Sequence, residues 1–348
     1  KLGLRLEGAW LWHWKDRIDR AFMAKFADYP AMPTPALPKE AVKGMADALG
    51  EKPLCGGCGA KVAGATLGAA LQHLPLPKRP DVLSGPGDDA GILRHGKGVQ
   101  VLTTDHLRAF TNDAALMARI TAIHALGDIW AMGAQPQSAL SQITLPRLGP
   151  ALQAEMLGEI LSAATSVFGA AGADILGGHT SIGAELTIGF SVTGLADHPI
   201  RKTAAQENDA IILTKPIGTG TILAAEMATA QMAGQTSDLM LGEVVATCMA
   251  SMLHPLATAS RILSPHATAM TDVTGFGLAG HLLEMLDGAG LSATLALKDI
   301  PTLPGAQTLA ALGHASSIAP ANRALCLGRI NAPNSPHSAL LFDPQTAG

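Results

Sequence analysis

The sequence is poor in aromatic residues, in charge and in cysteine, and each scarcity excludes a class of protein. Aromatic residues make up 3% of the 348 residues, which argues against the stacking platforms that bind single-stranded nucleic acid. Lys and Arg number 24 against 28 Asp and Glu, so the basic excess of an electrostatic nucleic-acid binder is missing. We therefore expect no nucleic-acid partner.

The four cysteines are too few for a disulfide scaffold in a chain of this length, which favours a reducing, cytoplasmic setting. We find no run of about 18 uncharged apolar residues, so the sequence predicts no membrane span. What the chain does have is 48% hydrophobic residues, enough for a large core, and a length typical of about two domains.

Composition divides the chain into four segments. Residues 1–28 carry Trp10, Trp12 and Trp14 and an amphipathic helix pattern, which fits either a membrane-surface helix or the tail of a preceding domain; we expect the tail. Residues 29–52 are Pro-rich and predict a linker. We expect two lobes in the rest of the chain, an N-terminal lobe at residues 53–205 and a C-terminal lobe at residues 206–348. The chain starts inside an apolar pattern and stops at a turn-like string, so we expect cut ends and a truncated second lobe.

Strand and helix patterns alternate from residue 53 onward, which predicts α/β or α+β layers. The expected strands cover residues 98–104, 173–177, 185–195, 210–213 and 268–272. The expected helices cover residues 112–132, 150–171 and 278–286.

One loop, Cys55-Gly-Gly-Cys58-Gly-Ala-Lys61, combines open thiols with an ammonium group. A nearby lysine favours the thiolate form of a cysteine. The loop fits a reactive thiol, a redox Cys-x-x-Cys pair, half of a zinc site or an inert turn. Because Cys248 and Cys326 are isolated, zinc is disfavoured, and we favour one working thiol.

Several carboxylates stand at turns and predicted strand ends: Asp88, Asp89, Asp105, Asp128 and Asp272. Such residues are often only turn formers or helix caps. Asp128 and Asp272 have apolar neighbours, however, and a buried carboxylate requires a cation or hydrogen-bond donors. If these acids converge, they form the oxygen-rich site that Mg²⁺ prefers together with substrate phosphates.

Glycines next to polar donors recur in Gly177-Gly178-His179-Thr180, in Gly218-Thr-Gly220 and in Gly275-Phe-Gly277. Glycine lets backbone N–H groups approach a phosphate, although each string alone is weak evidence. Together these features predict Mg²⁺-dependent phosphoryl transfer. The open thiol is surplus to that task and indicates a soft substrate or nucleophile, sulfur or selenium.

Eight ordered motifs over residues 53–348 resemble selenophosphate synthetase (selenide, water dikinase). They are Cys58-Gly-Ala-Lys61, Gly87-Asp88-Asp89-Ala90, Thr103-Thr-Asp105, Gly127-Asp-Ile-Trp-Ala-Met-Gly133, Gly177-Gly-His-Thr180, Leu213-Thr-Lys-Pro-Ile-Gly218, Met270-Thr-Asp-Val-Thr-Gly-Phe-Gly-Leu278 and Asp343-Pro-Gln-Thr346. The resemblance implies a two-lobed aminoimidazole-ribonucleotide-synthetase-like fold that dimerises through the sheet of the N-terminal lobe. It implies conversion of ATP, selenide and water to selenophosphate, AMP and phosphate, with Mg²⁺.

The resemblance also assigns roles to individual residues. Cys58 and Lys61 are the catalytic residues it implies, and Asp89, Asp128 and Asp272 are the implied Mg²⁺ ligands. The resemblance makes residues 53–205 the ATP-binding lobe. The implied ATP contacts are Lys61, Pro86, Gly87, Asp88, Asp105, Asp128, Gly178, His179 and Thr180.

Residues 11–26 resemble the tail of a flavin-dependent NADH-dehydrogenase-like module, fused in front in some members, which would supply reduced selenium. The chain departs from the family pattern at Ala60, where some members have a second Cys, at His124, where some have Asn, and at Ala347, where Ser is more usual. Two main alternatives remain open: another ATP-dependent enzyme of the same fold, such as a thiamine-phosphate kinase or a hydrogenase-maturation protein, or a non-catalytic selenium or sulfur carrier. A third is a redox module working through Cys55 and Cys58.

Overall fold

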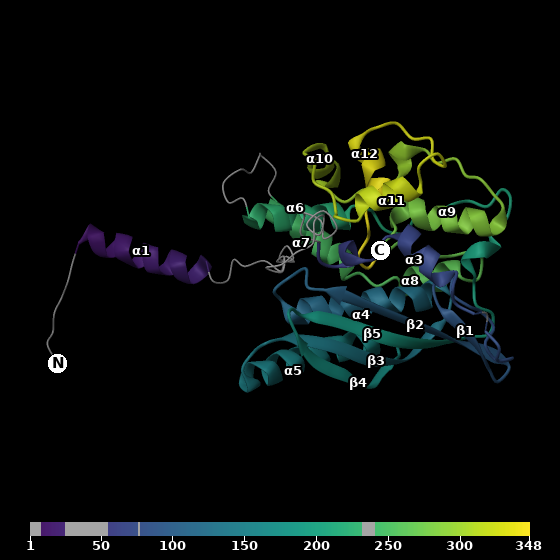
Figure 1. Ribbon diagram of the computed structural model, residues 1–348, viewed down its shortest axis with the longest axis horizontal. Coiled ribbons are helices and arrows are strands. Elements are labelled where there is room, and N and C mark those ends of the chain that lie inside the picture. The colour runs from purple at the N-terminus through teal and green to yellow at the C-terminus, as the bar shows by residue number, and fades with distance from the viewer. Residues whose placement is uncertain (1–7, 25–54, 76, 232–240) are drawn as a thin grey trace, which may run out of the picture.

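A five-stranded sheet carries the first lobe, and a layer of helices forms the second (Figure 1). The computed structural model describes residues 8–24, 55–75, 77–231 and 241–348. The proposed linker, residues 29–52, lies outside the described residues. The strands are β1 (Gly91–His95), β2 (Gly98–Arg108), β3 (Gln135–Pro146), β4 (Asp174–Gly183) and β5 (Thr187–Ala196).

The strands lie in the order β1-β2-β5-β3-β4. Every neighbouring pair is antiparallel except β3 and β4, which are parallel. A parallel pair requires a crossover connection, here helix α5 (Pro150–Ala170), which packs on β3 and β4. The expected strand 98–104 in fact continues to Arg108, so Asp105 lies inside a strand and not at its end.

Helix α4 (Ala114–Ala131) is the centre of the molecule. It lies between the sheet and the second lobe (Figure 1), and its described contacts include β2, β3, β5, α5 and α8 (Ala257–Leu263). Asp113 caps it by accepting a hydrogen bond from the Leu116 N–H at 2.8 Å. The helix is apolar on nearly every side, which is the pattern of a fully buried helix. It therefore presents Asp128 and His124 to the interior.

The second lobe consists of short helices in the described residues. They are α6 (Thr219–Gln231), α7 (Leu241–Met252), α8, α9 (Gly277–Ala289), α10 (Ala306–Ala311), α11 (Ala319–Leu325) and α12 (Pro336–Ala339).

Short 3-10 turns occur in both lobes. They are η1 (Cys58–Ala60), η2 (Lys202–Ala204), η3 (Leu297–Asp299) and η4 (Leu340–Phe342). Helix α3 (Gly64–Leu71) packs against α11.

The expected strands at 210–213 and 268–272 are wrong: neither segment is a strand here. A strand requires a ladder partner for its backbone groups. No described strand pairs with residues 210–213, and Ile211 and Ile212 are 50% and 65% exposed. Their apolar pattern did not supply a strand neighbour.

The string 343–348, which looks turn-like in the sequence, lies largely inside the protein. Gln345 is 1% exposed, and its Oε1 accepts hydrogen bonds from the N–H groups of Gly218 and Thr219 at 2.8 and 3.1 Å. These N–H groups begin helix α6, where backbone donors have no partner within the helix. The string therefore joins the start of α6 to the core.

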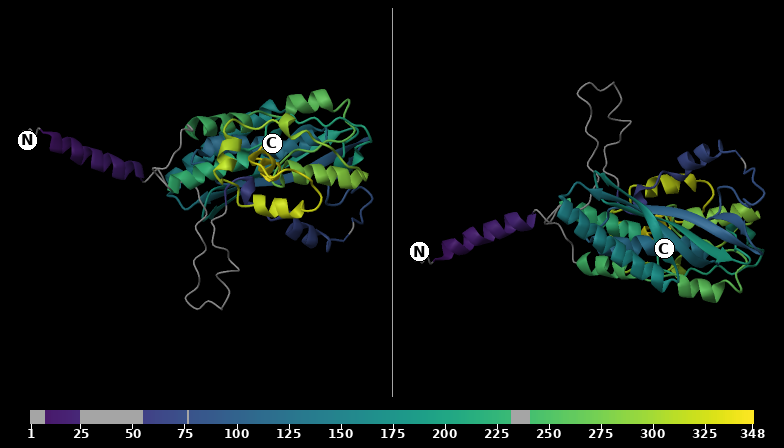
Figure 2. Two further views of the ribbon diagram at one scale, coloured as in Figure 1. Left: turned by 90° about the horizontal axis from the view of Figure 1, so that it is seen from above. Right: turned by 90° about the horizontal axis from the view of Figure 1, so that it is seen from below.

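Helix α1 (Ala9–Ala24) lies apart from the rest of the described chain in all views (Figures 1 and 2). Its three tryptophans are exposed, at 57–69%. Among the described residues, no helix combines the length and the apolarity that crossing a membrane requires.

Gly277 and Gly290 stand at opposite ends of α9 in left-handed conformations, with φ of 73° and 69°. A Cβ on Gly277 would lie 2.9 Å from the carbonyl oxygens of Leu341 and Asp343, whereas a Cβ on Gly290 meets nothing within 4 Å. We expect Gly290→Ala to cost about 1 kcal/mol of unfolding free energy, for the backbone conformation alone. Gly277→Ala should cost roughly 1–3 kcal/mol more, because the backbone must also move. Urea denaturation measures both; equal losses would contradict the packing argument.

Candidate active site

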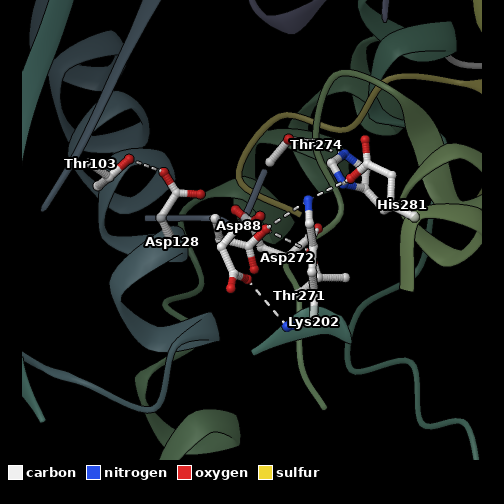
Figure 3. Close-up of polar contacts among 10 residues, drawn as sticks. Asp88, Thr103, Asp128, Lys202, Thr271, Asp272, Thr274 and His281 are labelled. Atoms are coloured by element: carbon white, nitrogen blue, oxygen red, sulfur yellow. Dashed lines mark hydrogen bonds and ion pairs between the residues drawn. The ribbon is translucent and has the colours of Figure 1, made fainter. Parts of the chain in front are cut away.

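Three aspartates from distant parts of the chain meet between the lobes; Figure 3 labels two of them, Asp128 and Asp272. Asp89 precedes β1, Asp128 lies on α4, and Asp272 lies in the loop before α9. One carboxylate oxygen of each lies within 4.8 Å of the other two. Gly127 permits this approach, because a Cβ at that position would lie 2.7 Å from Asp272 Oδ2.

These carboxylates are held where negative charge is costly. Burial raises the pKa of Asp89 to about 7, against the lowering effect of Lys202. Burial and the neighbouring carboxylates raise the pKa values of Asp128 and Asp272 well above their usual range. Asp89 Oδ2 is buried and has no hydrogen-bond partner among the described residues. Such an arrangement requires a proton or a cation to compensate it.

Hydroxyl and ammonium groups orient the carboxylates from both lobes (Figure 3). Thr103 on β2 donates to Asp128, and Thr271 Oγ1 donates to Asp89 Oδ1 at 2.9 Å. Lys202 Nζ lies 4.0 Å from Asp89 Oδ1 and donates to Glu284 Oε2 at 2.7 Å. The threonine donors leave other carboxylate oxygens available.

The three-carboxylate set suits a hard divalent cation. Mg²⁺ prefers carboxylate oxygens, and usually only a few of them, completing its shell with water and substrate phosphates. The buried, unpartnered oxygen of Asp89 fits this use. The described residues at this point offer no thiol or imidazole to the cluster, so a soft-metal site is not indicated.

A second polar group adjoins the aspartates and contains the predicted thiol and lysine. Lys61 Nζ lies 3.3 Å from Asp105 Oδ1, and His124 Nε2 lies 3.3 Å from Cys58 Sγ. Burial acts to lower the pKa of Lys61, but the negative groups around it, with Asp105 first, together outweigh burial and raise that pKa. Burial acts to raise the pKa of Asp105, but the positive charge around it, including that of Lys61, holds it below its usual value. Lys61 and Asp105 are therefore a charged pair.

The two cysteines of the loop have different environments. Cys58 is 1% exposed, and burial raises the pKa of its thiol to about 12 despite the opposing effect of Lys61. Cys55 is half-buried and clasps Ser317: its N–H donates to Ser317 Oγ at 3.0 Å, and its Sγ accepts from the Ser317 N–H at 3.4 Å. Ser317 also donates to the Gly59 carbonyl at 3.0 Å. The loop is thus fastened to the second lobe with Cys58 turned inward.

The predicted ATP contacts divide into two groups. Asp88 lies beside the site, where its Oδ1 accepts from the Lys202 N–H at 3.2 Å, and Pro86 and Gly87 are exposed just before it. Gly178, His179 and Thr180 instead lie on β4, at the other edge of the sheet.

His179 does not reach the carboxylates of its own chain. In the strand register, His179 lies opposite Gln142, which lies opposite Gly189, which lies opposite His106. His106 on β2 is therefore three strand spacings, or about 14 Å, from His179. His106 and His179 line one hollow of about 440 Å³ on the sheet. Because side chains alternate along a strand, Asp105 faces the opposite side.

Lys202, Thr271, His281 and Glu284 escaped sequence reasoning. His281 Nε2 lies 3.3 Å from Thr274 Oγ1, and its Nδ1 lies 3.8 Å from Glu284 Oε2. Burial lowers the pKa of His281 to about 3, so its ring is neutral. Only Thr271 had a signal, since it stands next to Asp272 in a recognised motif.

Comparisons with known proteins show the family to which this chain is similar. The AIR synthase related protein, N-terminal domain, matches residues 87–196, and the corresponding C-terminal domain matches residues 206–317. A selenide, water dikinase of Geobacter metallireducens is 36% identical over 301 residues, covering 84% of both chains. One of Paraburkholderia xenovorans is 34% identical over 302 residues, covering 84% of this chain and 82% of the relative.

This chain belongs to the selenide, water dikinase family. The resemblance carried by the motifs is thereby confirmed, while a flavoprotein module in front of the chain stays a prediction. Solved structures of thiamine monophosphate kinase share the fold. Those from Aquifex aeolicus and Stenotrophomonas maltophilia have TM-scores of 0.55 and 0.54 at 13% and 20% identity. They cover 81% and 83% of this chain, and 84% of each of their own. The expected two-lobed α/β fold of this selenide, water dikinase family member is confirmed.

The crowded aspartates should make the cation-free protein less stable as pH rises. Their pKa values are higher in the folded chain than in the unfolded one. Folding therefore takes up protons above about pH 4, up to about pH 7 for Asp89, and the unfolding free energy falls as pH rises through this window. We expect Asp272→Asn to raise the unfolding free energy in EDTA at pH 8 by roughly 1–3 kcal/mol.

This gain should shrink as the pH is lowered toward 5. Thermal and urea unfolding at both pH values measure it, with the exposed Asp174→Asn as the matched control. A variant that is less stable than the native chain at pH 8 would contradict the charge-crowding argument.

Proposed function

We propose that this chain makes selenophosphate from ATP, selenide and water, releasing AMP and phosphate. The observation that carries the proposal is the position of the Cys58–Lys61 loop beside the three clustered aspartates. A plain kinase of this fold needs the acidic cluster but has no use for a buried thiol next to Lys61. The family relationship supports the same reaction.

We propose that Asp89, Asp128 and Asp272 hold Mg²⁺. When bound, the cation neutralises charge on the phosphates of ATP and fixes their position. Lys61 lies next to Asp105 and keeps its positive charge, so it is suited to contact the transferred phosphoryl group. Pro86, Gly87 and Asp88 form the neighbouring loop that we assign to ATP.

We propose that Cys58, and not Cys55, serves the selenium chemistry. The Cys58 sulfur faces Lys61, Asp105 and His124, whereas the Cys55 sulfur is bonded to Ser317. Cys58 is buried, so selenide reaches it only when the loop opens from Ser317. The free cysteines suit a reducing, cytoplasmic setting, and a flavoprotein module that delivers reduced selenium would be a fitting supplier.

We propose a homodimer that uses the sheet face carrying His179. Leu102 and Leu140 are 38% and 49% exposed on this face. A second copy would cover them, and it would bring Gly178, His179 and Thr180 near bound nucleotide, which they do not reach within one chain.

Phosphorus NMR of the products from ATP, Mg²⁺ and selenide tests the reaction. Selenophosphate, AMP and phosphate in equal amounts are expected. ADP as the nucleotide product would indicate a kinase of the thiamine-phosphate type, and failure to bind nucleotide in calorimetry would indicate a selenium or sulfur carrier.

Single substitutions separate the two halves of the site. We expect Asp272→Asn to abolish ATP turnover, because a charged ligand is lost from the acidic cluster. Cys58→Ser should abolish selenophosphate but retain idle ATP hydrolysis, while Cys55→Ser should keep both activities. The same NMR assay measures all three. Full selenide-dependent activity in Cys58→Ser would remove the thiol from the mechanism.

The homodimer is tested by a charge in the exposed sheet face. We expect Leu140→Asp to convert the dimer to a monomer in sedimentation velocity, because a carboxylate would be buried without a partner. Leu312→Asp, at a residue 57% exposed in the second lobe, is the matched control and should remain dimeric. A monomeric native chain, or an unaffected Leu140→Asp, would refute this interface.

A further inference from the structure

His124 is completely enclosed, and every polar neighbour of its ring is defined. It is 1% exposed on the inner face of α4. Its Nδ1 accepts a hydrogen bond from the Ala347 N–H at 3.2 Å. Its Nε2 lies 3.3 Å from Cys58 Sγ and 3.7 Å from Asp105 Oδ2.

The Ala347 contact determines which ring nitrogen carries the hydrogen. A backbone N–H can only donate, so Nδ1 must present its lone pair. Burial lowers the pKa of His124 to about 4, so the ring is neutral and has a single N–H. That hydrogen is on Nε2, the nitrogen that faces the sulfur and the carboxylate.

Ala347 takes an unusual conformation to make this contact. Its φ is 53°, in the left-handed region that non-glycine residues rarely occupy. In the same conformation its carbonyl accepts from Lys215 Nζ at 2.6 Å. Backbone strain of this kind persists only where the surroundings enforce it.

We propose that His124 is a positioning residue that donates its Nε2 hydrogen to the sulfur of Cys58 and thereby stabilises the thiolate. When Cys58 is a thiol, its sulfur is only a weak acceptor for this hydrogen. When the thiol loses its proton, the sulfur becomes the stronger acceptor and takes the hydrogen bond. The thiolate would otherwise be costly in this buried place, where Lys61 is the neighbouring cation.

Other charged groups around the pair are accounted for. Cys58 faces Lys61 from its own loop, Asp105 from β2 and Asp272 from the loop before α9. His124 faces Lys61, Asp105 and Lys215. None of the substitutions below alters these groups. The inference rests on the proposed function only in treating Cys58 as the working thiol.

Alkylation by iodoacetamide at pH 8, followed by mass spectrometry, reads the thiolate directly and does not depend on selenophosphate formation. His124→Phe keeps a ring but removes the donor, and we expect about tenfold slower alkylation of Cys58, equivalent to one pKa unit. His124→Gln restores an N–H donor and should return the rate to within about threefold, a change of less than half a pKa unit. Cys55 in the same loop is the internal control for loop opening, since its sulfur contacts Ser317.

Each outcome decides. Slowing confined to Cys58 and rescued by Gln supports the proposal. Equal slowing of Cys55 and Cys58 indicates a change in loop opening and overturns it, as does an unchanged Cys58 rate in His124→Phe. If His124→Phe fails to fold, nitrogen NMR of the native histidines tests the same point: hydrogen on Nε2 of His124 is expected, and hydrogen on Nδ1 overturns the proposal. If the native chain forms no selenophosphate, the proposed function is refuted, while the contact between His124 and Cys58 is still tested by alkylation.

Discussion

Mutual repulsion among Asp89, Asp128 and Asp272 is the constraint on which this structure depends. Three carboxylates with oxygens within 4.8 Å of one another cannot all be ionised in a buried place without a compensating charge. Several features of the fold nevertheless bring them together: a buried helix that carries Asp128, a glycine that leaves room for Asp272, and threonine donors from both lobes. This arrangement is consistent with the proposal that a cation and a polyphosphate complete the site.

The loop from Cys55 to Lys61 is held in place by the same interface between the lobes. Its outer side is clasped by Ser317, and its inner side meets β2 and α4 through Asp105 and His124. The buried string Asp343–Gly348 touches both ends of this arrangement, because Gln345 binds the start of α6 and Ala347 binds His124. A shift of the string 343–348 would therefore change the hydrogen bonds both at the start of α6 and at the imidazole of His124.

Sequence reasoning performed best where one local signal was sufficient. The long apolar pattern around Asp128 predicted a helix, α4, and an acid in such surroundings was correctly suspected of having partners. Reasoning failed at residues 210–213 and 268–272, where an extended pattern found no strand partner, and it ended β2 too early at Asp105. Lys202, His281 and Glu284 had no local signal, because their significance comes from neighbours in other elements.

Residue types and motifs alone predicted the kind of chemistry: acids for a hard cation, a lysine for phosphate and a thiol for a soft element. The alternation of strand and helix was predicted for β2, α4, α5, β4 and β5 of the first lobe, but wrongly for residues 210–213 and 268–272 of the second. Only the tertiary structure decided which residues share a site. It grouped three aspartates, separated His179 from them by the width of the sheet, and set the hydrogen of His124 through a backbone group of Ala347. The physical reason is that proximity, burial and hydrogen-bond direction belong to contacts between distant segments, and local spacing does not encode them.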